Sequence, residues 1–146
     1  MLGGFMGGFT TSQVEKLSGV NQKVLHYWDK SGFLSPSLVQ AQGAGSRRVY
    51  SFQDLVAIRM ARELRDAGIS LQGLRKSVEF LRNLESVEQP LAETFLVTDG
   101  KDIYLKRGDA VMSVLRQSGQ GCFYFVVDLS RTVEGLREAV KKLFAA

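Results

Sequence analysis

The sequence predicts an α+β protein with a helical first half and a second half of ββαβα order. Through most of the first 84 residues, apolar side chains recur three and four positions apart, as on an amphipathic helix. After Pro90 they form alternating or continuous runs, which are typical of strands. With 146 residues, 45% apolar and 23% charged, the chain has the size and composition of one globular domain or two small ones.

Two short helices are expected first. Ser12 and Glu15 have the spacing of a capping box, and Ser18-Gly19 ends this helix. Asn21 can cap a second helix that runs to about Lys30 and stops before Gly32. Its buried stripe is expected to hold Val24, Leu25 and Trp28. Because the intervening turn is so short, the pair is predicted to be a helix-turn-helix.

Two short strands and two more helices complete the first half. Phe33–Pro36 and Arg47–Tyr50 are read as extended, and the polar segment 40–46 between them as a mobile exposed loop. Ser51 starts a third helix that ends at Gly68, and Ser70 starts a fourth. The inward positions of these two helices are Leu55, Ile58, Ala61, Leu64, Leu74, Val78 and Leu81.

The second half is expected to form a compact unit. Asp99-Gly100 predicts a hairpin turn between strands at 94–98 and 102–106. Gly108-Asp109 is expected to cap a helix that carries Val111, Val114 and Leu115. The run Cys122–Val127 is apolar on both faces, which predicts a central strand, and a last amphipathic helix follows from Thr132 to Leu143.

The charge is unevenly distributed. The net charge of +4 and the isoelectric point near 9.4 are mild for the whole chain. Residues 1–82 hold 11 Lys and Arg against 6 Asp and Glu, whereas residues 83–146 hold 8 against 9. A nucleic-acid-binding module joined to a near-neutral module would show this division.

The rare residues exclude several classes of function. One cysteine, Cys122, and one histidine, His26, allow neither an internal disulfide nor a Cys/His zinc site. No nucleophile, base and orienting group can be assembled, so we expect no enzyme, no cofactor and no metal. No apolar run is long enough for a membrane span. A single buried Cys122 fits a reducing cytoplasm, and we do not expect it to act as a sensor thiol. Gly119–Gly121 is read as a plain connection rather than a phosphate loop.

In its first half the chain resembles the MerR-type transcriptional regulators. The segments that carry the resemblance, in order over residues 9–82, are Phe9-Thr10, Leu17–Val20, Val24–Leu34, Arg48–Leu55 and Leu64–Leu71. The resemblance implies a winged helix-turn-helix fold, in which the second helix enters the major groove and the loop between the strands is a wing. The helix pair that follows would form a second wing.

The resemblance and the helical periodicity together select candidate DNA contacts. The start of the second helix can reach base edges, and a basic outward face continues along it, while the arginine pair lies at the root of the wing. The candidates are Thr11, Asn21, Gln22, Lys23, His26, Tyr27, Lys30, Arg47, Arg48 and Tyr50. The alternatives are a plain surface histidine at 26, a core tyrosine at 27 and a solvated arginine pair at 47–48.

Three features depart from the family pattern. His26 stands where an arginine is usual, and Glu15 lies near a position that is usually a small alanine. The apolar stripe ends near Leu84, ahead of Pro90, where family members continue into a long dimerising helix. We therefore expect the C-terminal unit to supply the dimer contact, with the fourth helix as a candidate contributor.

The leading interpretation is a sequence-specific DNA-binding regulator that acts as a homodimer on a near-palindromic operator in the cytoplasm, associated with the nucleoid. Its expected parts are a flexible tail at 1–8, a DNA-binding domain at 9–84, a linker at 85–90 and a C-terminal domain at 91–146. RNA polymerase or another protein is a possible partner of that last domain. The alternative is a protein-interaction factor, of an antitoxin, segregation or recombination type, that its first half tethers to DNA.

Overall fold

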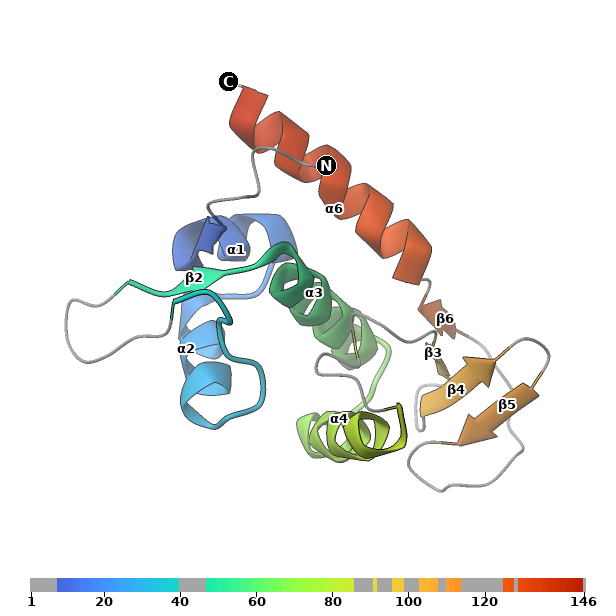
Figure 1. Ribbon diagram of the computed structural model, residues 1–146. Helices are drawn as coiled ribbons and strands as arrows, with labels where there is room; N and C mark the ends of the chain where they lie inside the picture. Colours follow the sequence, from blue (N-terminus) through green and yellow to red (C-terminus); the bar gives the residue numbers. More distant parts are fainter. Residues whose placement is uncertain are drawn as a thin grey trace. The chain divides into compact units, whose positions relative to one another are not determined.

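The computed structural model describes residues 8–39, 47–85, 91, 96–98, 103–107, 110–113, 125–127 and 129–145 (Figure 1). Its contacts divide the chain into two compact units, one of residues 1–59 and 133–146 and one of residues 60–132. Helices α3 (Phe52–Asp66) and α6 (Leu129–Ala145) each contribute residues to both units. Within the described residues, no helix combines the length and the hydropathy needed to cross a membrane.

The first unit opens with a small antiparallel sheet. β1 (Phe9–Thr10) pairs with β2 (Val49–Tyr50), so that Phe9 lies opposite Tyr50. The segment Phe33–Pro36, which was expected to be extended, forms no strand, and Val39 forms the bridge to Val49. Phe33 and Leu34 are buried, and Pro36 has no N–H group to donate to a ladder. The loop at 40–46 lies outside the described residues.

Helix α1 (Thr11–Ser18) starts two residues earlier than the sequence indicates. Thr10, not Ser12, is its N-cap: the Thr10 hydroxyl accepts a hydrogen bond from Gln13 N, and Gln13 Oε1 accepts one from Thr10 N. This reciprocal capping box satisfies two backbone donors at the helix start. The helix ends at Gly19, whose φ of 78° suits a residue without a Cβ atom.

Helix α2 (Gln22–Lys30) has the bounds that the sequence predicts. Asn21 Oδ1 accepts a hydrogen bond from Lys23 N at 2.7 Å. At the other end, Gly32 N donates to Asp29 O and Phe33 N donates to Trp28 O, which is a Schellman motif. The rings of Trp28 and Phe33 meet edge to face with their centroids 5.3 Å apart, so this end of the helix is fixed both by hydrogen bonds and by packing.

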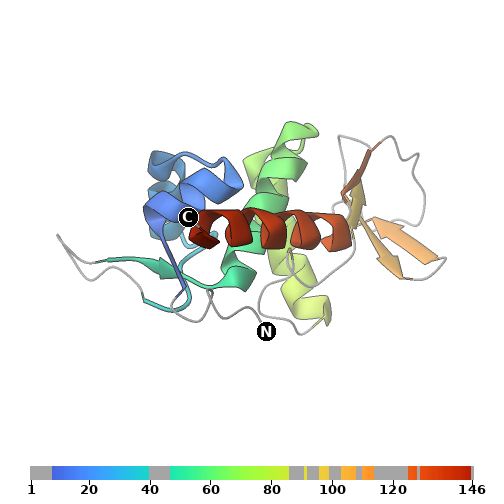
Figure 2. The ribbon, with the colours of Figure 1, turned by 90° about the horizontal axis from the view of Figure 1, so that it is seen from above.

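The core of the first unit lies between α1, α2, β2, the start of α3 and the C-terminal part of α6. Ser51 and Asp54 form the capping box of α3. Figure 2 shows α6 as one long helix whose C-terminal end belongs to this unit, and the rings of Phe9 and Phe144 lie 6.2 Å apart. The largest buried side chains of the unit are Phe9, Leu25, Trp28, Phe33, Leu34, Tyr50, Leu55 and Ile58, together with Leu136 and Val140 of α6.

The second unit contains the end of α3, helix α4 (Leu71–Glu85) and a four-stranded antiparallel sheet. Gly68, with a φ of 109°, follows α3, and Ser70 Oγ caps α4 by accepting a hydrogen bond from Gly73 N. The sheet has the order β5-β4-β3-β6, with β3 at Leu96–Thr98, β4 at Ile103–Arg107, β5 at Ala110–Ser113 and β6 at Phe125–Val127. The predicted hairpin is confirmed as the β3–β4 pair.

Two expectations about this sheet are wrong. The segment expected to form a helix after Gly108-Asp109 contains the strand β5, in which Ala110 pairs with Arg107. A two-residue Gly-Asp spacing between extended segments is itself a hairpin signal, and it outweighs the capping role assigned to Asp109. The run Cys122–Val127 contains β6, which lies at the end of the described strand order and not in its centre.

Candidate nucleic-acid interface

One face of α2 consists of polar and cationic side chains that are exposed. His26, Tyr27 and Lys30 lie three, four and seven residues after Lys23, and all four side chains are exposed. Tyr27 has 55% of its surface accessible, whereas Leu25 and Trp28 on the opposite side have 1% and 5%. The structure thus brings these four candidates together on a single face.

Val24 does not belong to the buried stripe in which the sequence analysis placed it. Its side chain is 38% exposed. The buried side chains of α2 are Leu25 and Trp28, and Val24 lies beside them at the edge of the exposed face. An apolar group therefore borders the cationic face.

The first residues of α2 are engaged by α1. The Glu15 carboxylate accepts two hydrogen bonds from Gln22, one from its backbone N at 2.9 Å and one from its side-chain Nε2 at 3.1 Å. The side-chain oxygen of Asn21 accepts the capping hydrogen bond from Lys23 N. A carboxylate at this end of a helix is favourable because it faces unsatisfied N–H groups and the positive end of the helix dipole.

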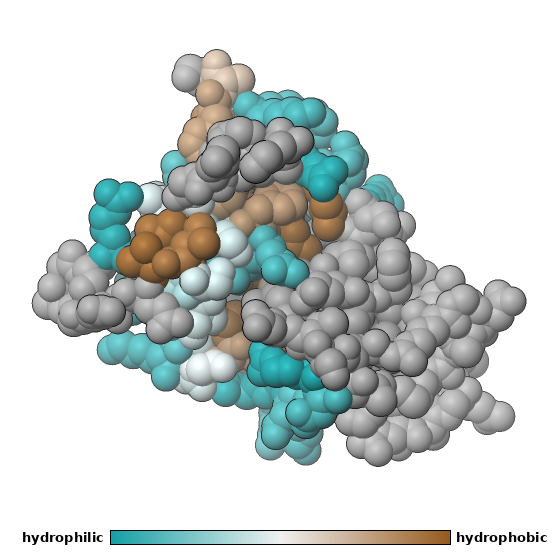
Figure 3. Space-filling view, in the orientation of Figure 1, coloured by the Kyte–Doolittle hydropathy of each residue, from teal (hydrophilic) through white to brown (hydrophobic). Residues whose placement is uncertain are grey.

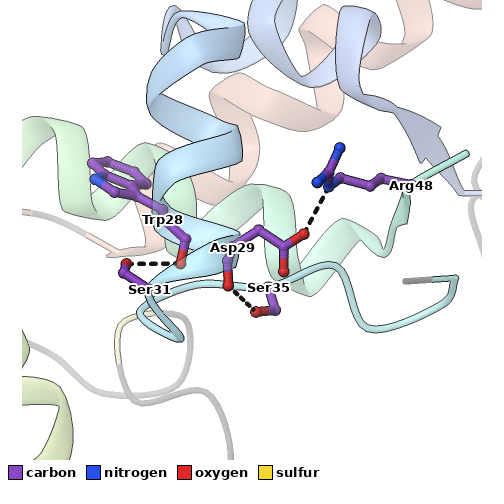
Figure 4. Close-up of polar contacts among 5 residues, drawn as sticks. All are labelled: Trp28, Asp29, Ser31, Ser35 and Arg48. Carbon is purple, nitrogen blue, oxygen red and sulfur yellow. Dashed lines mark hydrogen bonds and ion pairs between the residues drawn. The ribbon is translucent and has the colours of Figure 1, made fainter. Parts of the chain in front are cut away.

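Arg48 forms an ion pair with α2. Its Nε lies 2.7 Å from Asp29 Oδ2, and the two side chains are only 14% and 15% exposed (Figure 4). The carbonyl oxygen of Asp29 also accepts a hydrogen bond from Ser35 Oγ at 3.3 Å. Arg48, which was expected to contact DNA from the wing, is therefore joined to α2, while its neighbour Arg47 is exposed.

Tyr50 belongs to the core rather than to the surface. It is completely buried, so the structure does not place its ring where the sequence analysis expected a DNA contact. Burial, assisted by the negative charge of Asp29, raises the pKa of Tyr50 to about 12. The positive charge of Arg48, and to a smaller extent the Thr11 side chain, lower the pKa of Tyr50 and offset part of this shift. Thr11 and Tyr50 do not reach hydrogen-bond geometry, and Tyr50 Oη has no partner among the described residues. Thr11 itself is half-buried at the start of α1.

The surface beside β2 is partly apolar. Leu38 and Val39 have exposed fractions of 50% and 48%. Figure 3 shows a hydrophobic patch over this part of the first unit. Among the basic residues predicted to contact DNA, Lys23, Lys30 and Arg47 are exposed, and Arg48 is half-buried. Cys122 and Gly119–Gly121 lie outside the described residues, and the residues that are described contain no cluster of His, Cys, Asp and Glu that could hold a metal ion.

A short helix, a tight turn and a second helix with an exposed cationic face define the class of helix-turn-helix nucleic-acid-binding proteins. The model of the MerR HTH family regulatory proteins matches residues 9–81, half of the chain. The chain therefore belongs to this family of bacterial DNA-binding transcription regulators.

Several named proteins are similar to the chain. An uncharacterized HTH-type transcriptional regulator of Mycobacterium tuberculosis strain H37Rv is 33% identical over 120 residues, which are 82% of this chain and 52% of that protein. A Streptomyces coelicolor protein that carries the name heat shock protein HspR is 27% identical over 71% of this chain and 67% of its own length. The HTH-type transcriptional regulator HmrR of Sinorhizobium medicae is 30% identical over 49% of this chain and 46% of its own. The chain spans about half the length of the mycobacterial relative.

Two residues that organise the site, Glu15 and Asp29, were not among the predicted contacts. Glu15 was predicted to form the capping box of its own helix together with Ser12. Thr10 and Gln13 have the same spacing of three residues, and they form the capping box in the structure. Asp29 was not singled out, because its partner lies 19 positions away across the 40–46 loop. A contact between residues this far apart in the sequence can be identified only once the tertiary structure is known.

Proposed function

We propose that this chain is a sequence-specific DNA-binding regulator that acts as a homodimer on a near-palindromic operator. The observation that carries the proposal is the exposed face of α2, with Lys23, His26, Tyr27 and Lys30 in one stripe. Membership of the MerR family supports DNA as the partner. Lys30 supplies positive charge for phosphates, while Lys23, His26 and Tyr27 supply groups that can contact bases or sugar.

The remaining candidate residues take different parts in this proposal. Asn21 and Gln22 lie at the start of α2, the end of a recognition helix that approaches base edges. Arg47 is exposed beside β2 and would contact the backbone. Arg48 would act partly through Asp29, because their ion pair holds β2 against α2.

The test is selection of bound duplexes from a random-sequence DNA pool with the full chain. Symmetric recovered sites, with half-sites about one helical turn or a multiple of it apart, would support the homodimer. Fluorescence anisotropy then compares a recovered site with its scrambled version. Failure to enrich any sequence, or equal affinity for a recovered site and its scrambled version, would overturn the proposal.

Variants then assign the interface. We expect Lys23→Ala and His26→Ala to change the preference among bases, and Lys30→Ala to weaken binding to all duplexes. Each lost phosphate contact should make the slope of log affinity against log salt less steep by about 0.9. The control is Lys142→Ala, which removes the same charge from an exposed position of α6 and should leave that slope unchanged.

A further inference from the structure

Gln22 is the first residue of α2, and its amide is oriented by a single carboxylate. Glu15 Oε2 accepts the backbone N–H of Gln22 at 2.9 Å, and Glu15 Oε1 accepts the side-chain Nε2 at 3.1 Å. Both residues are half-buried between α1 and the start of α2. The two hydrogen bonds together allow the Gln22 side chain far fewer conformations than an exposed glutamine has.

The chemistry of the pair decides which way the amide points. An ionised carboxylate is only an acceptor, so the NH₂ group of Gln22 must face Glu15 and the amide oxygen must face away. The oxygen accepts no hydrogen bond from any described residue. The NH₂ group has two hydrogens, of which Glu15 takes one. One donor and one acceptor therefore remain side by side.

This remaining pair matches one base edge in the major groove. Adenine presents N7 as an acceptor and N6 as a donor, and glutamine binds both at once. Gln22 lies one helical turn before His26, on the same flank of α2, so both side chains can address neighbouring base pairs.

We propose that Glu15 is a positioning residue that orients Gln22 to recognise an adenine in the major groove. This inference rests on the proposed function, since it requires α2 to enter that groove. It goes further by assigning a base to one side chain and by giving a role to Glu15, which touches no DNA itself.

The experiment is selection from a random duplex pool with the full chain and with Gln22→Ala, Glu15→Gln and the double variant. We expect the unmodified chain to prefer A·T at one position of the selected site, or at one position in each half of a symmetric site. Gln22→Ala should reduce that preference by about tenfold or more, as expected for loss of a bidentate contact. Glu15→Gln should reduce it in part, because a neutral amide no longer dictates the orientation of Gln22.

The double variant separates positioning from a structural role. In the Gln22→Ala background, Glu15→Gln should cause no further change at that base pair. If Glu15 serves only to join the helices, Glu15→Gln will lower the melting temperature and weaken all duplexes equally with the base preference intact, and the inference is wrong. Glu134→Gln, an exposed site on α6, controls for the lost charge. Absence of any enriched sequence for the unmodified chain overturns the proposed function, whereas an enriched site that ignores Gln22 overturns only this inference.

Discussion

Arg48 Nε and Asp29 Oδ2 lie 2.7 Å apart, and this ion pair joins the residue before β2 to the C-terminal turn of α2. Both side chains are largely shielded from water, with exposed fractions of 14% and 15%, so the pair is less screened than one at the surface. It fixes the root of the predicted wing relative to the helix that carries the cationic face.

The first prediction concerns this pair. Asp29→Ala and Arg48→Ala should each lower the free energy of unfolding by about 1 kcal/mol, and the double variant should lose less than the sum. Asp29→Ala should also weaken DNA binding, although it removes a negative charge. Chemical denaturation and anisotropy titrations measure the two effects. Stronger DNA binding by Asp29→Ala would mean that Arg48 acts only as a phosphate contact that Asp29 restrains.

A second prediction compares two glycines with positive φ. Gly8 and Gly32 have φ of 74° and 77°, a region that costs residues with a Cβ about 1–2 kcal/mol. A Cβ at Gly8 would lie 2.6 Å from Val49 Cγ1 and 2.8 Å from the carbonyl oxygen of Tyr50, whereas a Cβ at Gly32 would meet nothing within 4 Å.

Gly8→Ala should therefore be the more destabilising change, by about 1–3 kcal/mol beyond Gly32→Ala, because β1 and β2 would have to separate. Gly32→Ala is the matched control for backbone strain. Equal shifts of the denaturation midpoint in the two variants would show that Gly8 is not held against β2.

The helices of the first half were predictable because their signals are local. The Asn21 cap, the terminal Gly19 and Gly32, and the inward positions Leu55 and Leu64 of α3 all depend on neighbours within a few residues. β1 was missed, since two residues carry no periodicity, and its partner Tyr50 is 41 positions from Phe9.

For the site, the sequence could predict the exposed face of α2 but not the partners of its residues. The exposure of Lys23 and Lys30 on one face of α2 could be predicted from helical geometry alone. The Asp29–Arg48 ion pair and the burial of Tyr50 depend on how β2 packs against the helices. The periodicity of apolar residues along the sequence does not predict such packing. The placement of β5 shows a similar limit, because a Gly-Asp dipeptide occurs both at helix caps and in hairpins, and only the pairing of β4 with β5 decides between them.

A third prediction concerns the carboxylate of Asp54. Its Oδ2 accepts hydrogen bonds from Ser51 N at 2.9 Å, Ser37 N at 2.7 Å and Ser37 Oγ at 2.7 Å, and the residue is 4% exposed. Asp54→Ala removes the charged acceptor of these three hydrogen bonds and should lower the free energy of unfolding by about 3 kcal/mol. Asp54→Asn should lose less, since its amide oxygen still accepts. The neighbouring Gln53→Ala, at an exposed position, is the control for helix propensity, and a loss as large there would contradict the role of Asp54.

The last prediction uses the buried phenol of Tyr50. Its pKa is raised to about 12 in the folded chain, chiefly by burial, against about 10 in an unfolded chain. Below pH 10 both states keep the proton, so the group contributes no pH dependence there. Between pH 10 and pH 12 the unfolded state releases its proton first, so the stability of the folded state falls as the pH rises. The two pKa values correspond to a loss of about 2–3 kcal/mol by pH 12.

Tyr50→Phe should remove this part of the alkaline destabilisation and should fold at least as stably at neutral pH, because it deletes a buried hydroxyl that has no partner among the described residues. Tyr27→Phe is the matched control, since that ring is 55% exposed and its hydroxyl reaches solvent. Urea denaturation at intervals from pH 8 to pH 12 measures the slope for all three chains. If the Tyr50→Phe variant loses stability over this range as steeply as the unmodified chain, other tyrosines and lysines account for the alkaline transition.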